Sequence, residues 1–175
     1  MAKAKQFGGL TASEFGMTEV QELIPSIYAG WHAYQDAMTR VIAPLGPDHL
    51  SLRAAPSLRS VAEIAAHMVG ARARWFQGEG GREFEAFGKW DRREARARSA
   101  DELVSGLEGT WTGMHAAISR WTPEDWRKTW PGEDDSEPEV ITRQWVIWHL
   151  IEHDLHHGGE ISITLGAHGV AALEL

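Results

Sequence analysis

The chain has 175 residues, and its 25 acidic against 17 basic side chains give a net charge of -8. This charge argues against nucleic acid or an anionic membrane as a partner, because both attract basic proteins. The sequence contains no cysteine, which excludes disulfides and a thiol nucleophile, so any metal must be held by histidine and carboxylate.

An apolar share of 43% and nine tryptophans supply a sizeable core, as expected for a single globular domain of this length. No basic segment followed by an apolar run opens the sequence, and no apolar stretch approaches the roughly 18 residues of a membrane span. We therefore expect a cytoplasmic protein, with a flexible N-terminal arm over residues 1–17 and one domain over residues 18–175.

Apolar residues recur at three- and four-residue steps from Val20 to Ile42, which predicts a first amphipathic helix. Thr18 and Gln21 fit a capping box at its start, although Pro25 offers a second starting point, because proline is favoured in a first turn.

A second helix is predicted from Ser57 or Ser60 to Phe76, with Glu63 placed to complete a capping box with Ser60. Arg72 interrupts its apolar stripe. Residues 79–98 carry many charges and are interpreted as a solvated loop or short surface helix.

Ser99 and Glu102 form the pattern of another capping box, and apolar spacing extends a third helix to Trp121. A polar connection over residues 122–138 separates it from a fourth helix, which begins near Glu139. No segment shows the alternation of a strand. The sequence therefore predicts an all-α fold, a four-helix bundle.

The fourth helix contains His149, His153, His156 and His157 within nine residues. Because each helical residue advances roughly 100°, positions four apart lie on one face, so His149, His153 and His157 form a stripe. Two imidazoles at this spacing can converge on a divalent metal, but a further ligand is needed. His67, at the margin of the second helix, is the best candidate.

Several features of this region have simpler interpretations. A single histidine on an apolar face is more often a hydrogen-bonded core residue than a ligand, which suits His32, His49, His115 and His168. The pair Gly158-Gly159 can end a helix, but the helical period continues through Ile161, so we expect the helix to continue.

The pattern His149-x-x-x-His153-x-x-His156-His157-x-Gly159-Glu160-Ile161, with the separate His67, resembles the DinB-like (DinB/YfiT) superfamily over residues 20–169. The resemblance implies up-down-down-up topology and a metal site of His67, His153 and His157. His149 and His156 match positions that are not usually ligands. Gly158 stands where many relatives have arginine, so the role of that arginine does not carry over.

Three imidazoles leave a coordination position open, as in catalytic sites. The resemblance implies a metal-dependent enzyme, either a hydrolase or an S-transferase acting with a low-molecular-weight thiol on a small-molecule substrate. Three imidazoles suit zinc, nickel, iron or manganese to different degrees, and we expect zinc or nickel. Glu63, Glu152 and Asp154 neighbour the ligands, and each is a candidate general base or hydrogen-bond partner. The alternatives are a non-catalytic stress-response or binding protein with a structural or vestigial metal site, and a helical homodimer whose histidines only pack.

Overall fold

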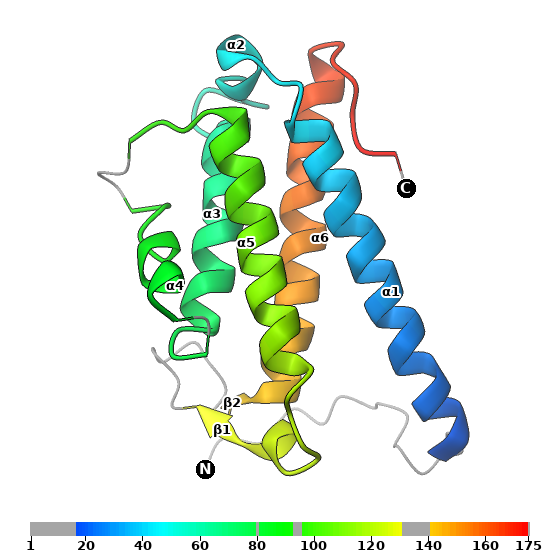
Figure 1. Cartoon of the computed structure of the whole chain (residues 1–175). Coiled ribbons are helices and arrows are strands. Elements are labelled where there is room, and N and C mark those ends of the chain that lie inside the picture. The colour runs from blue at the N-terminus through cyan, green and yellow to red at the C-terminus, as the bar shows by residue number, and fades with distance from the viewer. Residues whose placement is uncertain (1–16, 80, 93–95, 131–140, 175) are drawn as a thin grey trace, which may run out of the picture. The chain divides into compact units, whose positions relative to one another are not determined.

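The computed structural model describes residues 17–79, 81–92, 96–130 and 141–174 (Figure 1). Residues 17–33 and 34–174 belong to two compact units, and each is described by itself. The predicted arm, residues 1–17, lies almost wholly outside the described residues. No helix in the described ranges combines the length and the apolar character needed to cross a bilayer.

Helices dominate both units. The elements are α1 (Met17–Ile42), α2 (Pro47–Leu50), α3 (Val61–Trp75), α4 (Gly81–Phe87), α5 (Ala100–Ile118), the 3-10 helix η1 (Asp125–Arg127), the strands β1 (Thr129–Trp130) and β2 (Ile141–Thr142), and α6 (Arg143–Ala167). The all-α prediction is confirmed, and α1, α3, α5 and α6 are the four helices expected from the sequence.

The start of α1 differs from one of the two alternatives left open by the sequence. The helix begins at Met17, so Pro25 lies inside it and does not start it. In the unit of residues 17–33, the rings of Tyr28 and Trp31 pack edge to face with centroids 5.8 Å apart, as expected for side chains three positions apart on one helical face.

The expectation that the chain has no strand is wrong. The two-residue strands β1 and β2 pair antiparallel, with Thr129 opposite Thr142 and Trp130 opposite Ile141. Segments this short carry no alternation that a sequence pattern can reveal. Helix α6 consequently begins after β2 and not near Glu139, and the Thr142 hydroxyl caps it by accepting the Trp145 N–H at 3.1 Å.

Two of the three predicted capping boxes, those of α3 and α5, are present. In α3, the Ser60 hydroxyl accepts the Glu63 N–H at 3.3 Å and the Glu63 carboxylate accepts the Ser60 N–H at 2.7 Å. Ser99 and Glu102 make the same exchange at the start of α5. Each box satisfies backbone donors that have no partner inside the helix, which fixes where the helix begins.

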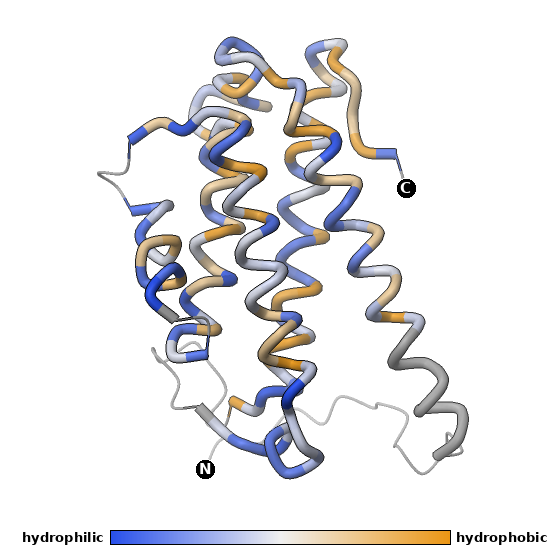
Figure 2. The backbone as a smooth tube through the Cα atoms, viewed as in Figure 1, coloured by the Kyte–Doolittle hydropathy of each residue, from blue (hydrophilic) through white to orange (hydrophobic). Residues whose placement is uncertain are grey.

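Within residues 34–174, α3 packs against both α5 and α6, and apolar residues recur along all three helices (Figures 1 and 2). The last turns of α1 complete this core. Its fully buried side chains are Met38, Ile42, Val61, Ala65, Met68, Val69, Leu103, Leu107, Ile161 and Leu165. The core therefore fixes α3 and α6 side by side, which places their polar edges together.

Arg72 explains the imperfect stripe in α3. Its guanidinium is 1% exposed and forms a two-pronged ion pair with Asp154 of α6, which is 0% exposed, at 2.7 and 3.1 Å. The same group donates to Gln35 of α1 at 2.8 Å and to the Leu107 carbonyl of α5 at 3.3 Å. Buried charges persist when paired and hydrogen-bonded, so Arg72 ties the four helices together at one level.

Candidate metal centre

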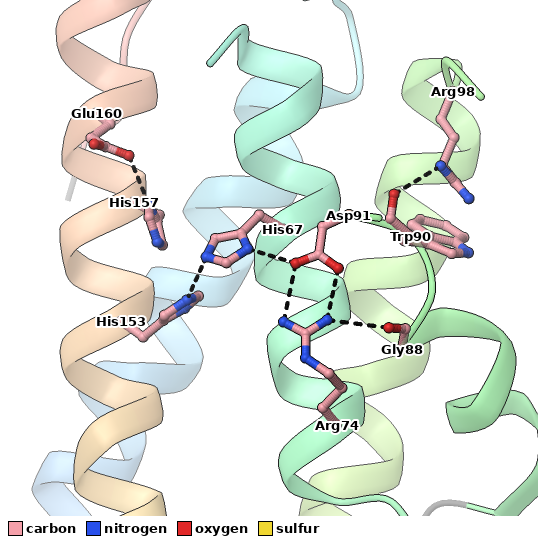
Figure 3. A network of polar contacts seen from close by, with 9 residues as sticks. All are labelled: His67, Arg74, Gly88, Trp90, Asp91, Arg98, His153, His157 and Glu160. Atoms are coloured by element: carbon pink, nitrogen blue, oxygen red, sulfur yellow. Dashed lines mark hydrogen bonds and ion pairs between the residues drawn. The ribbon is translucent and has the colours of Figure 1, made fainter. Parts of the chain in front are cut away.

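Three histidines converge between α3 and α6 (Figure 3). His67 comes from α3, and His153 and His157 come from successive turns of α6, with potential ligand atoms all within 4.8 Å of one another. The Nε2 atoms of His67 and His153 lie 3.1 Å apart. The pairing of His153 with His157 follows from helical spacing, whereas His67 joins them because α3 packs on α6.

Carboxylates orient two of the three imidazoles. Nδ1 of His67 lies 2.7 Å from Oδ2 of Asp91, and Nδ1 of His157 lies 2.7 Å from Oε2 of Glu160 (Figure 3). A neutral imidazole that donates its Nδ1 proton keeps a lone pair on Nε2, which is then available to a metal. Metal-bound histidines usually have a hydrogen-bond partner of this kind on the second ring nitrogen.

The donor set fits a divalent metal. Tetrahedral Zn–N bonds of about 2.0–2.1 Å place two ligand nitrogens about 3.3 Å apart, close to the 3.1 Å between His67 and His153. A simple hydrogen bond between these Nε2 atoms would need a proton on one of them. Because His67 donates its Nδ1 proton to Asp91, a hydrogen bond between the two Nε2 atoms would be donated by His153, and metal binding would replace that proton.

The second ring nitrogen of His153, unlike those of His67 and His157, has no carboxylate partner among the described residues. Its Nδ1 is buried, and no hydrogen-bond partner reaches it from the described residues. Burial, reinforced by the neighbouring His157 and His67, lowers the pKa of His153 to about 2. Burial also lowers the pKa of His157, against the opposing effect of its hydrogen bond to Glu160. Both imidazoles are therefore neutral at pH 7, which is the form that binds metals.

Asp91 is itself firmly held. Arg74 donates to its two carboxylate oxygens at 2.7 and 3.0 Å, and to the Gly88 carbonyl at 3.2 Å (Figure 3). Burial disfavours the charge of Asp91, but the contacts with His67 and Arg74 outweigh it and hold its pKa well below the usual range. Gly70 leaves the space that this carboxylate occupies, since an added Cβ would lie 2.8 Å from Oδ1.

The sequence pattern does not predict Asp91 and Glu160 as hydrogen-bond partners of the ligands. Glu160 follows His157 by three residues, a spacing that places two side chains in contact on a helix, so a local signal existed. Asp91 is 24 residues from His67 in a charged segment and has no such signal.

The residues that were selected lie elsewhere. Glu63 caps α3 and pairs with Arg53 at 2.9 Å, Asp154 pairs with the buried Arg72, and Glu152 is solvent-exposed on α6. The hydrogen-bond positions on His67 and His157 are held instead by Asp91 and Glu160, as described above.

The two remaining histidines of the motif lie beside the centre. His149 stacks on Trp145 with ring centroids 4.9 Å apart and planes 8° from parallel. His156 is exposed and forms with His157 and Glu160 a second group with metal-binding potential. That group lies on one helix and competes with the centre for His157.

The packing around α6 explains why position 158 is a glycine in this chain. An added Cβ would lie 2.6 Å from Cε of Met38 and 2.7 Å from Cζ of Tyr34, and closer still to the Tyr34 hydroxyl. That hydroxyl donates to the Leu155 carbonyl at 3.3 Å. The space beside α6 is thus filled by the Tyr34 ring, and a larger residue at position 158 requires Tyr34 and Met38 to move.

A model of the DinB family matches residues 17–174. The chain belongs to the DinB family. This assignment agrees with the histidine pattern and with the arrangement of His67 opposite His153 and His157.

Two solved structures share the fold of this DinB family member. A DinB-like protein from Bacillus cereus is 20% identical, with a TM-score of 0.67 over 87% of this chain and 97% of that chain. A DinB-like protein from Bacillus subtilis is 17% identical, with a TM-score of 0.59 over 86% of this chain and 96% of that chain. The comparison with curated proteins gave no match.

Proposed function

We propose that His67, His153 and His157 bind one divalent metal ion through Nε2, with zinc or nickel as the metal. The observation that carries this proposal is the orientation of the imidazoles: Asp91 and Glu160 accept the Nδ1 protons of His67 and His157 at 2.7 Å. Nitrogen donors suit both zinc and nickel, and the supply of metal in the cell commonly decides between them.

We further propose that the centre is catalytic. Three protein ligands leave a position for water or substrate, and a metal there activates water or a thiolate and polarises a carbonyl. The chain has no thiol of its own, so an S-transferase reaction requires an externally supplied low-molecular-weight thiol. Asp91 and Glu160 hold the ligands in one tautomer and orientation throughout such a reaction. A metal-dependent hydrolase uses the same arrangement with water.

The proposal also covers the bundle topology, the cellular location and the oligomeric state of the protein. The up-down-down-up bundle topology, a cytoplasmic location and a homodimeric state are expected and each needs its own experiment. Light scattering coupled to size exclusion distinguishes a monomer from a homodimer. The competing hypothesis, a structural metal in a non-catalytic protein, predicts that chelation lowers the melting temperature while no thiol or ester substrate is turned over.

The test is elemental analysis of protein purified without a metal-affinity tag. We expect about one zinc or nickel per chain in the parent and little in His67→Ala and His153→Ala, because an open site needs all three ligands. His149→Ala is the matched control, since it removes an imidazole from the same face of α6 that is not a proposed ligand. Full metal content in His153→Ala would contradict the ligand assignment.

The catalytic part is tested separately on metal-loaded protein. Consumption of thiol with electrophilic substrates and hydrolysis of ester substrates are measured for the parent and for His153→Ala. Turnover in the parent that is lost in the variant supports catalysis. A metal that stabilises the parent, with no turnover across both substrate classes, favours the structural alternative.

A further inference from the structure

A cavity of about 1220 Å³ opens beside the first turns of α3 and α5. Its walls come from residues 43–53, from residues 57–66, which include the first turns of α3, and from residues 90–92 and 96–101. The three proposed metal ligands do not line it. Its size exceeds the range of about 300–1,000 Å³ that is common for small-molecule sites.

The charge of this wall is opposite to that of the whole chain. Arginines line the cavity from two segments (Arg53, Arg59, Arg92, Arg96 and Arg98). The acids in the wall are fewer (Glu63, Asp91 and Asp101). In a protein of net charge -8, a local excess of guanidinium groups in a concave surface attracts anions specifically to that place.

Two of the five guanidiniums are already neutralised. Arg53 pairs with Glu63, and Arg96 pairs with Glu102. No hydrogen bond or ion pair to the guanidinium of Arg59 or Arg92 is found among the described residues. These two side chains are exposed at the cavity and are available to a ligand.

Arg98 is held in place without an acid. Its guanidinium lies 4.2 Å from the centre of the Trp90 ring, and it donates to the Trp90 and Arg96 carbonyls at 3.3 and 3.0 Å. Its Nε is buried, with no hydrogen-bond partner in the described part of the chain. Burial, together with the charge of Arg96, lowers the pKa of Arg98, and the nearby charge of Glu102 opposes this effect only in part.

Two helix starts reach the same wall. Ser60 and Ser99, the N-caps of α3 and α5, both line the cavity. The carboxylates of Glu63 and Glu102 already occupy these two helix ends in the capping boxes, so the arginines alone supply the positive charge of the wall. Leu50, Leu58 and Trp90 supply apolar surface nearby.

From these observations we propose that the cavity is a second ligand site, which binds a small molecule through an oxyanion group, carboxylate or phosphate. Arg59 and Arg92 contact the oxyanion, and the apolar wall holds the rest of the molecule. The proposal does not depend on a metal at the three histidines. Because Asp91 lines the cavity and also orients His67, the occupant lies next to the metal centre's supporting residues.

The test is calorimetric titration of the full chain with inorganic phosphate and, separately, with succinate. We expect saturable binding of at least one anion, and the tighter of the two identifies the oxyanion. Arg59→Ala/Arg92→Ala should bind about tenfold more weakly or worse, because charge-assisted hydrogen bonds are lost. Arg120→Ala, which removes an exposed arginine outside the cavity, should bind as the parent does.

One further variant separates this site from the metal centre. His153→Ala should retain the anion affinity of the parent, since it does not line the cavity. The proposal is overturned if the parent binds neither anion, or if the double arginine variant binds as tightly as the parent. Loss of binding in His153→Ala alone would also overturn it, because the anion would then occupy the metal centre. Circular dichroism of each variant confirms that it is folded.

Discussion

Replacing the adjacent glycines of α6 one at a time should change stability in opposite directions. In Gly159→Ala, the new Cβ meets nothing within 4 Å. Alanine in a helix interior is favoured over glycine by about 0.5–1 kcal/mol, because the unfolded chain loses less freedom on folding. Gly159→Ala should therefore be more stable than the parent by about that amount.

Gly158→Ala carries the same gain but also a clash. Its Cβ would lie 2.6 Å from Met38 Cε and 2.7 Å from Tyr34 Cζ, well inside van der Waals contact. Forcing atoms into a packed core typically costs about 1–3 kcal/mol, and displacing Tyr34 also loses its hydrogen bond to Leu155, worth about 1 kcal/mol. After the helix gain, the expected net destabilisation is about 1–3 kcal/mol.

Urea and thermal unfolding of the two variants measure this difference. Each 1 kcal/mol shifts the melting temperature of a chain of this size by about 2–4 °C, so the two variants should bracket the parent. Tyr34→Phe/Gly158→Ala should recover part of the loss, because the nearest atom is removed. A Gly158→Ala protein as stable as Gly159→Ala would refute the packing of Tyr34 against α6.

Three further outcomes follow from the same structure. Asp91→Asn keeps the ligand His67 but weakens its hydrogen-bond partner, so metal affinity should fall by about 10–100-fold. Competition with a chelating dye measures this affinity, and an unchanged value would show that the His67–Asp91 contact has no influence on the metal. Arg72→Met should destabilise the protein by about 3–5 kcal/mol in urea, because Asp154 loses its buried counter-charge, and Arg72→Met/Asp154→Leu should recover most of the loss; equal losses in both would contradict the pairing. Metal-free protein should lose stability as the pH falls below about 6.5, because unfolded histidines bind protons there while His153, with a pKa of about 2 in the folded state, does not. Chemical unfolding at a series of pH values checks this, and in His153→Ala the slope should be smaller.

The helices were predictable because their determinants are local. Two capping-box patterns, Ser60 with Glu63 and Ser99 with Glu102, predict the starts of α3 and α5, and both boxes are present. The three- and four-residue spacing of apolar side chains identified the four long helices. The pair β1 and β2 was missed, because two-residue strands pair across a gap of ten residues and leave no periodic pattern.

Two of the three candidate metal ligands were predictable from local spacing in the same sense. His153 and His157 lie on one face of α6 whatever the rest of the chain does, because the helix itself sets their spacing. His67 was selected as the third member from its position at the edge of an apolar stripe. That it reaches His153 at 3.1 Å depends on how α3 packs against α6.

The sequence by itself determined the helical class, the capping of α3 and α5, and the histidine face of α6. Only the tertiary structure decided the partners of those residues: Asp91 for His67, Asp154 for Arg72 across 82 residues, and Tyr34 for the space over Gly158. The reason is physical. Interactions within one helical turn are fixed by backbone geometry, whereas contacts between distant segments are fixed by core packing, which no short stretch of sequence contains.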